Sequence, residues 1–401
     1  MKRIIAFSFF SFLVLNLYSQ KTELKPYWDN GLKFSGKSKD FSVKIGGRIQ
    51  YDLMMMRQDD SLDNHFDANP GAEFRRARLF TSGTVYKTIK YKFQVDFAGN
   101  RVVIKDAYIR LTKIPYIGNI TLGNFKEPRS FQMITSSKYI TMMERSLTNQ
   151  FDNDRNLGVM VNNQFFDRSL SLYTGYFYPS GNNAKYIGKE YNLAFRLVGI
   201  PYYIDEKNNF KVIHLDAGFT YENHDNRKAS YSARPESHLA PKYLNVEMDE
   251  SKSLIEYNGG LVAIFNSLSF QGEYTYADVN TGPSSVLEKD KYGLFSFYGT
   301  LSWFVTGEHK NYSKKKVAFD KIKPKKNFAD DSGLGAWEVA IRYSIMNLND
   351  GDLQGGKMNN VTLGINWYLN PITKVAFNYI HSDIFELGIA NIYQMRFQIG
   401  F

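Results

Sequence analysis

A strict alternation of apolar and polar residues constrains the fold of this chain more than any other feature of its sequence. In residues 89–97 every odd position is apolar or aromatic (Ile, Tyr, Phe, Val and Phe), and every even position is polar (Lys, Lys, Gln and Asp). Successive side chains of a β-strand point to opposite faces, so this segment predicts a strand with one apolar and one charged face. The pattern recurs from residue 41 to the last residue and is interrupted by short turns at 86–88, 167–168, 266–267 and 370–371.

The alternating segments predict about sixteen strands and an all-β fold, a transmembrane antiparallel β-barrel whose apolar faces contact lipid and whose charged faces line a lumen. A strand of about 9–11 residues crosses a bilayer when it is tilted by about 45°. An even number of strands places both chain ends on one side, with short periplasmic turns and long extracellular loops. The segment 305–335 breaks this rule, since it is long but falls on the side of the short turns. The competing fold, a soluble β-sandwich, would turn its charged face to bulk water and would not usually collect arginine there.

The N-terminus predicts export. Lys2 and Arg3 precede a nearly uninterrupted apolar run at 4–17, and Ser19 is the small residue expected before a cleavage site. The chain has no cysteine and a mean hydropathy of −0.39, which exclude disulfides, thiolate metal sites and a helical membrane protein. The expected organisation is a signal peptide at 1–20, an N-terminal periplasmic segment at 21–40 and the outer-membrane β-barrel domain at 41–401.

The last residues repeat the alternation and end in Phe401. Tyr393, Met395, Phe397 and Ile399 share its parity, and this ending resembles the C-terminal signal that the barrel assembly machinery reads in outer-membrane barrels. A closed barrel also requires the last strand to pair with the first, because no backbone amide at membrane depth can stay unpaired. We therefore expect a protein of the Gram-negative outer membrane, surrounded by outer-membrane lipid and assembled by that machinery.

Arginine accumulates on the polar parity of the predicted strands. Sixteen strands leave a lumen wide enough for water, and the planar fork of a guanidinium group matches two oxygens of a phosphate at once. The alternative is that these arginines pair with acids of the same parity, and the sequence does not separate the two roles. The pore-lining, anion-binding candidates are Arg48, Arg76, Arg78, Arg110, Arg196, Arg342 and Arg396, and the acids are Asp52, Asp96, Asp106, Glu273 and Glu338.

Residues 126–155 break the alternation and form the longest loop of the first half of the chain. A long third extracellular loop that folds inward narrows many barrels of this kind, and the alternative is a solvated surface loop. The whole chain carries 50 Lys and Arg against 40 Asp and Glu, so a positive constriction would attract anions. The constriction-loop candidates are Lys126, Arg129, Lys138 and Arg145.

An ordered set of motifs resembles the phosphate-selective porin O and P family. The motifs are Glu73–Arg78 (EFRRAR), Leu122–Pro128 (LGNFKEP), Glu144–Ser146 (ERS), Asn156–Val159 (NLGV), Phe304–Glu308 (FVTGE) and Gly335–Tyr343 (GAWEVAIRY). The resemblance spans residues 41–401 and depends on the order of the motifs rather than on any single one. It implies a sixteen-stranded, trimeric anion channel with an arginine-lined path and a lysine-rich entry, which lets phosphate or other small anions diffuse passively.

Two other functions stay open: a general or other-substrate porin without phosphate selectivity, and a structural or adhesive outer-membrane barrel. We expect no enzyme, because the chain has only six His, and the triad-like His381-Ser382-Asp383 lies in one continuous stretch without an oxyanion-binding motif. We also expect no cofactor and no metal site. Nucleic acid is not an expected partner, since the basic residues are spread along the alternating strands instead of forming a patch.

Overall fold

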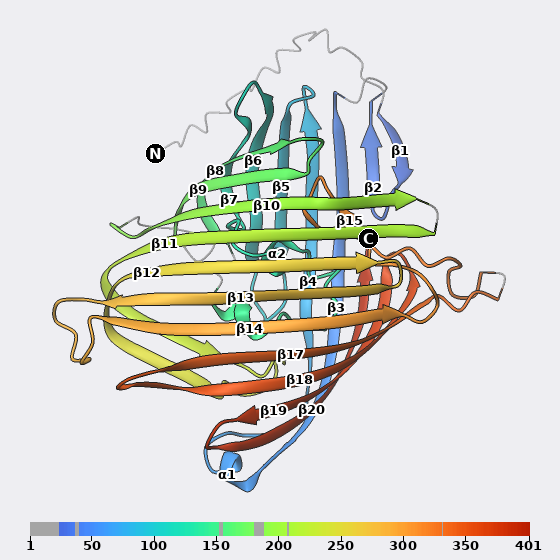
Figure 1. Ribbon diagram of the computed structural model, residues 1–401. Helices are drawn as coiled ribbons and strands as arrows, with labels where there is room; N and C mark the ends of the chain where they lie inside the picture. The colour runs from blue at the N-terminus through green and yellow to red at the C-terminus, as the bar shows by residue number, and fades with distance from the viewer. Residues whose placement is uncertain (1–23, 37–39, 152–154, 180–187, 207, 331) are drawn as a thin grey trace, which may run out of the picture.

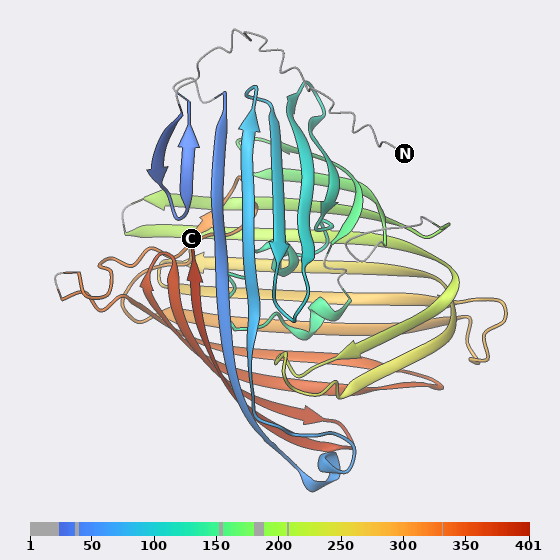
Figure 2. The same ribbon diagram turned by 180° about the vertical axis from the view of Figure 1, so that it is seen from behind.

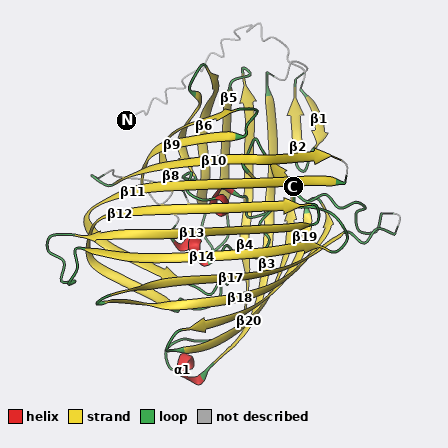
Figure 3. Cartoon of the chain, in the orientation of Figure 1, coloured by secondary structure: helices red, strands yellow, loops and turns green. Residues whose placement is uncertain are grey.

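The computed structural model describes residues 24–401 apart from 37–39, 152–154, 180–187, 207 and 331. The expected signal peptide therefore lies outside the described residues. Sixteen strands form a closed antiparallel barrel, as predicted (Figures 1 and 3). They are β3 (Ser42–Gln58), β4 (Gly71–Val85), β5 (Ile89–Asp96), β6 (Val103–Ile114), β7 (Gly118–Phe125), β8 (Asn156–Phe165), β9 (Leu170–Tyr178), β10 (Tyr191–Glu206), β11 (Asn209–Ala233), β12 (Leu244–Phe265), β13 (Leu268–Thr281), β14 (Lys291–Phe304), β17 (Ala336–Asp350), β18 (Leu353–Asn370), β19 (Thr373–Ile384) and β20 (Gly388–Gly400).

Backbone pairing closes the barrel between its first and last strands. β20 pairs with β3 from Ala390 opposite Gln58 to Gly400 opposite Arg48, and β3 pairs with β4 on its other edge. The wall therefore has no free strand edge at membrane depth, where an unpaired amide would cost several kcal/mol.

The two faces of the strands differ in exposure as the alternation predicts. Phe93 and Phe397 are each 45% exposed on the outside of the barrel. Arg342 and Arg396 belong to the opposite parity and are 2% and 1% exposed. The apolar residues therefore cover the outer surface, and the polar residues point inward.

A short hairpin extends the sheet beside the closure. β1 (Lys25–Trp28) pairs with β2 (Leu32–Ser35), and β2 pairs with the first residues of β3, from Leu32 opposite Ile45 to Ser35 opposite Ser42. β2 thus continues along the edge of β3 beyond the end of β20, and Figure 2 shows the C-terminus next to this hairpin. From the sequence only a periplasmic segment was expected at 21–40, and these strands were not predicted.

Two connections fold into the lumen from opposite ends. The loop 126–155 contains α2 (Phe131–Ile134) and the 3-10 helix η1 (Leu147–Gln150), and α2 lies inside the barrel in Figures 1 and 2. The segment 305–335 enters from the end with the short turns and contains the small hairpin of β15 (Tyr312–Ser313) and β16 (Ala318–Phe319). The remaining helix, α1 (Asp60–Asp63), lies outside the lumen, and no helix of the described chain is long and apolar enough to cross a bilayer.

A third inward segment is the tip of the β11–β12 hairpin, where the polar sequence of 223–253 is typical of a long extracellular loop. β11 continues to Ala233 and β12 begins at Leu244, and the tip of this hairpin bends into the barrel (Figure 2). Its apolar side chains, Leu244 and Met248 among them, form one buried cluster with Met54 and Ile392 from the barrel wall. The segment is therefore not a solvated loop, because it covers lumen-facing apolar residues near the long-loop end of the barrel.

Gly47 makes room for the terminal residue at the closure. Its amide donates to the carbonyl of Phe401 at 2.6 Å, and its carbonyl accepts from the amide of Phe401 at 3.1 Å. A Cβ at position 47 would lie 2.7 Å from Cζ of the Phe401 ring.

We expect Gly47→Val to destabilise the barrel by about 1–3 kcal/mol, the usual cost of overpacking, and to lower the temperature at which the folded form disappears on a heat-modifiability gel. Gly259→Val is the control, because a Cβ at Gly259 would meet no atom within 4 Å; equal losses for the two variants would contradict the prediction.

Candidate functional site in the barrel lumen

The loop 126–155 is anchored inside the barrel by a buried guanidinium group. Arg129 donates to Glu127 within the loop at 2.9 Å and to Glu256 on β12 at 2.8 Å. It also forms an ion pair with Glu222 on β11. One cation thus holds three carboxylates, two of which belong to the wall, so the loop is fixed to the β11–β12 side of the lumen.

A second anchor joins α2 to β13. Glu273 accepts hydrogen bonds from the backbone amides of Phe131 at 2.6 Å and Gln132 at 3.1 Å. The ring of Phe131 packs edge-on against His214 and against Phe319 of the segment 305–335, with centroids 4.9 Å and 4.8 Å apart. The two inward connections therefore meet inside the barrel, and the loop is not a solvated surface loop.

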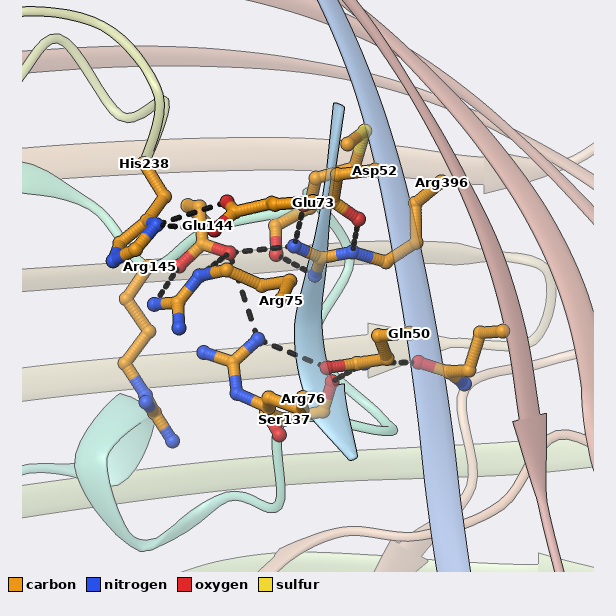
Figure 4. Close-up of polar contacts among 12 residues, drawn as sticks. Gln50, Asp52, Glu73, Arg75, Arg76, Ser137, Glu144, Arg145, His238 and Arg396 are labelled. Carbon is orange, nitrogen blue, oxygen red and sulfur yellow. Dashed lines mark hydrogen bonds and ion pairs between the residues drawn. The ribbon is translucent and has the colours of Figure 1, made fainter. Parts of the chain in front are cut away.

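Charged side chains converge where this loop approaches β3, β4 and β20 (Figure 4). Arg75 holds both oxygens of the Glu144 carboxylate, with Nε 3.0 Å from Oε1 and Nη2 3.1 Å from Oε2. Arg76 Nη1 lies 3.5 Å from Oε1 of the same carboxylate. Arg396 donates to Glu144 at 2.6 Å and forms a bidentate pair with Asp52 at 2.6 Å for each bond. Three guanidinium groups therefore surround one carboxylate of the loop.

A β-bulge lets adjacent arginines reach the lumen together. The register between β3 and β4 shifts between Gln50 and Tyr51, which leaves Arg75 without an opposite residue on β3. An extra residue in one strand re-aims its side chain, so Arg75 joins Arg76 on the inside. Strict alternation along β4 would point Arg75 outward, so Arg75 was not predicted as a site residue, and neither was Glu144. The adjacent arginines at 75 and 76 could have indicated the bulge. In a regular strand one of the two would face lipid, at a cost of about 2–4 kcal/mol.

The ionisation of Glu144 is fixed by its neighbours. Burial alone would raise the pKa of this carboxyl, but Arg75, Arg76 and Arg396 outweigh burial and hold its pKa well below the usual range. Glu144 is therefore negatively charged at neutral pH. With Asp52 included, three cations face two anions, so this group of residues keeps one positive charge.

Four of the seven predicted pore-lining arginines are hydrogen-bonded to carboxylates, and a fifth, Arg76, lies 3.5 Å from Glu144. A buried guanidinium group that is bonded to a carboxylate has little charge left to offer to a solute. Glu236 comes from the tip of the β11–β12 hairpin, so one of these pairs also holds that hairpin in the lumen. The pairs are Arg78–Asp96 at 2.6 Å, Arg196–Asp216 at 2.9 Å, Arg342–Glu236 at 2.5 Å and Arg396–Asp52 at 2.6 Å.

The five acids predicted on the lumen face all form ion pairs or hydrogen bonds within the protein. Asp52 and Asp96 belong to the pairs above, and Asp106 is shared by Arg155 at 2.7 Å and Lys92. Glu338 forms an ion pair with Lys310 of the segment 305–335, and Glu273 binds the amides of α2. None of the five is more than 6% exposed, so these acids present little negative charge to a solute in the lumen.

Arg48 and Lys138 have no carboxylate within ion-pair distance among the residues that the structure describes. Arg48 Nη1 donates to Ser137 Oγ of the loop at 2.6 Å. Lys138 follows Ser137 and lies within electrostatic range of Arg48, Lys44 and Lys92. Burial, reinforced by repulsion from these cations, lowers the pKa of Lys138 to about 7. Arg48 thus carries positive charge that no acid cancels, and Lys138 adds a positive charge that is present in part at neutral pH and grows as the pH falls below 7.

A second group of such cations lies nearer the short turns. Lys90 on β5 is directly opposite Arg110 on β6, and Arg110 Nε donates to the hydroxyl of Thr121 at 2.8 Å. Lys315, at the tip of the hairpin in the segment 305–335, lies within electrostatic range of Lys90. Within the described ranges, these three cations also have no carboxylate at ion-pair distance. The unmatched positive charge therefore follows the β3–β6 side of the lumen.

The other constriction-loop candidates brace the loop itself. Lys126 Nζ donates to the carbonyl of Met133, and Arg145 donates to the carbonyls of Gln132 at 2.9 Å and Thr135 at 3.0 Å. Arg129 belongs to the anchor described above. Lys138 is thus the loop candidate that adds to the unmatched charge.

A histidine contact lies beside the arginine group. His238, at the tip of the β11–β12 hairpin, lies 2.8 Å from the carboxylate of Glu73 (Figure 4). No group of three or more metal-ligating side chains occurs in the part of the chain that the structure covers. The charged side chains of this region can bind a solute electrostatically.

Comparisons with known proteins agree with this architecture. The sequence model of the family described as phosphate-selective porin O and P matches residues 43–387. Porin O of Pseudomonas aeruginosa is 25% identical, over 87% of this chain and 85% of that protein. Among solved structures, OmpT, an outer membrane protein of Vibrio cholerae, has a TM-score of 0.55 at 11% identity and covers 91% of this chain and 99% of its own. An anion-selective porin from Comamonas acidovorans has a TM-score of 0.53 at 12% identity, covering 90% and 100%. At these identities the two structures support the fold alone.

The anchor of the loop can be tested with Arg129→Met. Removing one partner of a buried ion pair costs about 3–5 kcal/mol, and here it leaves three carboxylates to repel one another. We expect the loop 126–155 to be cleaved faster by an added protease, while the barrel itself stays resistant. Arg227→Met is the control, because Arg227 forms an exposed pair with Glu190 at 3.0 Å, and such pairs contribute about 0–1 kcal/mol. Equal cleavage rates in the two variants would contradict the proposed anchor.

Proposed function

Because this chain belongs to the phosphate-selective porin O and P family, and is therefore an outer-membrane porin of a Gram-negative bacterium, we propose that its channel conducts small anions in preference to cations. The family and the barrel indicate a channel rather than an enzyme. Phosphate is the permeant that we propose first, on the strength of the family description and of Porin O. A porin for anions in general is the second candidate, since the charge of the lumen alone does not select among anions.

One observation carries the proposal of anion preference. The five lumen acids are buried and bonded, whereas Arg48, Lys90, Arg110, Lys138 and Lys315 have no carboxylate partner among the described residues. The number of arginines alone would overestimate the positive charge of the lumen, because carboxylates neutralise most of the predicted arginines. The surplus of positive charge lies on one side of the lumen, where a passing anion meets it.

The strength of such contacts suits conduction. Two unit charges 4 Å apart attract by about 1 kcal/mol in bulk water and about 4 kcal/mol at an effective dielectric constant of 20. Several contacts in this range can offset part of the dehydration of an anion without trapping it, which a channel requires. We propose Arg48, Arg75, Arg76 and Lys138 as the narrow part of the path, and Lys90, Arg110 and Lys315 as its continuation toward the short turns.

The first test is the reversal potential across a planar bilayer under a salt gradient. We expect anion preference at low salt and a weaker preference at high salt, because the screening length falls from about 10 Å at 0.1 M to about 3 Å at 1 M. Arg48→Gln combined with Lys90→Gln should lower the anion-to-cation permeability ratio several-fold. Lys87→Gln is the control, since Lys87 lies in an exposed turn and pairs with Asp40 at 3.3 Å. Millimolar phosphate should also reduce the chloride current.

Each outcome has a separate meaning. Cation preference at low salt would refute the proposed anion channel. Anion preference without any block by phosphate would leave the general anion porin and remove phosphate. A folded barrel that carries no measurable current would favour the structural or adhesive alternative.

We also propose that the protein is a homotrimer and that one part of its wall faces a neighbouring copy. β5 and β7 have 8 residues each, whereas β11 has 25. Eight residues tilted by about 45° span about 19 Å, less than the apolar band of about 25 Å that a barrel shows to lipid. A row of apolar residues nevertheless covers the outside of this low wall, and another copy would shield it. The row consists of Ile109, Leu122, Val159 and Tyr176, which are 54%, 44%, 43% and 39% exposed.

Val159→Trp tests the proposed contact between copies. An added indole is tolerated next to lipid but overpacks a close protein interface. We expect this variant to assemble as a barrel and to run as a monomer in native mass measurements in detergent. Val361→Trp on β18, where Val361 is 37% exposed, is the control and should keep the trimer. A trimeric Val159→Trp protein would place the interface elsewhere.

The remaining partners are proposed from the fold. Outer-membrane lipid would contact the exposed apolar residues outside the interface. We further propose that the barrel assembly machinery reads the C-terminal strand that ends in Phe401. The backbone bonds between Phe401 and Gly47 are compatible with a segment that is recognised first and then completes the closure.

A further inference from the structure

Glu144 is bound in the way that a small oxyanion would be bound. Its two carboxylate oxygens receive both ends of the fork of Arg75, one bond from Arg396 and the charge of Arg76 (Figure 4). Guanidinium groups recognise carboxylates and phosphates with the same planar geometry. The place that Glu144 occupies is therefore a place where a phosphate would fit.

Two of these arginines depend on Glu144 for their countercharge. Arg396 has its own carboxylate partner, because it forms the bidentate pair with Asp52. Arg75 and Arg76 contact no other carboxylate among the described residues, and Arg76 is otherwise bonded to the amide oxygen of Gln50 at 2.9 Å. If the Glu144 side chain turned away, these two guanidinium groups would be free to receive another anion.

The backbone around Glu144 is fixed on both sides, so only its side chain has freedom to move. The amide of Met143 donates to Asn378 Oδ1 at 2.8 Å, and the amide of Ser146 donates to Gln132 Oε1 at 2.9 Å. The carbonyl of Glu144 itself accepts from Arg342 at 3.0 Å. Displacing the carboxylate therefore requires rotation about side-chain bonds and no opening of the loop.

We propose that Glu144 is a tethered counter-ion, which occupies the anion-binding site of Arg75 and Arg76 at rest and exchanges with each passing anion. This inference rests on the anion channel proposed above and names the residue that sets how tightly the channel holds its permeant. A tethered carboxylate competes at a high effective concentration, so it weakens the apparent binding of a free anion and speeds its release. The residue thereby keeps a site of several guanidinium groups from becoming a trap.

The test compares the block of chloride current by inorganic phosphate in wild-type protein and in Glu144→Gln. The amide keeps the size of the side chain but removes the competing charge. We expect the phosphate concentration for half-block to fall about tenfold, equivalent to about 1.4 kcal/mol. The phosphate current at saturating phosphate should also fall, because release becomes slower. A residue that only braced the loop would not produce a tighter block when it is changed.

Two further variants control for a general loss of negative charge and for a failure of Glu144→Gln to assemble. Glu73→Gln removes the same charge from the same region, but Glu73 contacts His238 rather than the guanidinium groups, so its half-block should change less than twofold. Glu144→Asp keeps the charge on a shorter side chain, which should tighten the block about threefold. If Glu144→Gln does not assemble, Glu144→Asp decides in its place.

The possible failures are distinguishable. A wild-type channel that phosphate blocks, together with Glu144 variants whose block is unchanged or weaker, would overturn the counter-ion and leave the proposed function intact. An equal tightening in Glu73→Gln would show that any lost negative charge has this effect, and it would also overturn the specific role of Glu144. Absence of phosphate block in wild-type and variants alike would refute both the phosphate channel and its counter-ion.

Discussion

Backbone hydrogen bonding in lipid is the constraint on which the rest of this structure depends. An unpaired amide at membrane depth costs several kcal/mol, and the chain avoids this cost by pairing β20 with β3 along most of their length. Closure fixes which parity of every strand faces outward, so apolar and polar residues must alternate for as long as the wall lasts. The sixteen described strands of the barrel have no free edge for binding, and function therefore depends on side chains that point inward and on segments that enter from the ends.

The lumen contains many charged side chains, but its net charge is small because most of them are paired. Acids and arginines on neighbouring strands cancel one another in buried pairs such as Arg78–Asp96 and Arg196–Asp216. Other buried pairs fix the positions of the inward segments, as Arg342 does for the tip of the β11–β12 hairpin through Glu236. The field that a solute meets depends on the few cations left over, and these lie mainly along β3, β5 and β6. Anion preference, on this view, is a property of what remains unpaired.

The sequence predicted what is local and failed where distant segments meet. Alternation within a strand is decided by the strand itself, so the barrel, its sixteen strands and the lipid-facing side of Phe93 were predictable. The inward position of Arg75 depends on a bulge set by pairing with another strand. The partners of Arg129 lie about 90 and 130 residues further along the chain. The alternation of residues within a strand gives no information about contacts between segments so far apart. Met54 was the overlooked signal for the inward hairpin, because an apolar residue on the lumen parity needs a cover.

The proposed narrow part of the channel combines a backbone fixed by hydrogen bonds with charged side chains that could rotate, and the two would serve different needs. Anchors such as Arg129 and Glu273 hold the loop in one place, so that the distance between facing charges does not vary from one passing ion to the next. A site that is both rigid and fully unpaired would hold a phosphate for too long, since each added guanidinium contact deepens the well. In our proposal, the Glu144 carboxylate relieves this conflict, because it would occupy the binding site of Arg75 and Arg76 while its backbone stays still. Exchange with a passing anion would then replace one set of charge-assisted bonds by another of the same kind, so the barrier to passage would stay low without any loss of recognition.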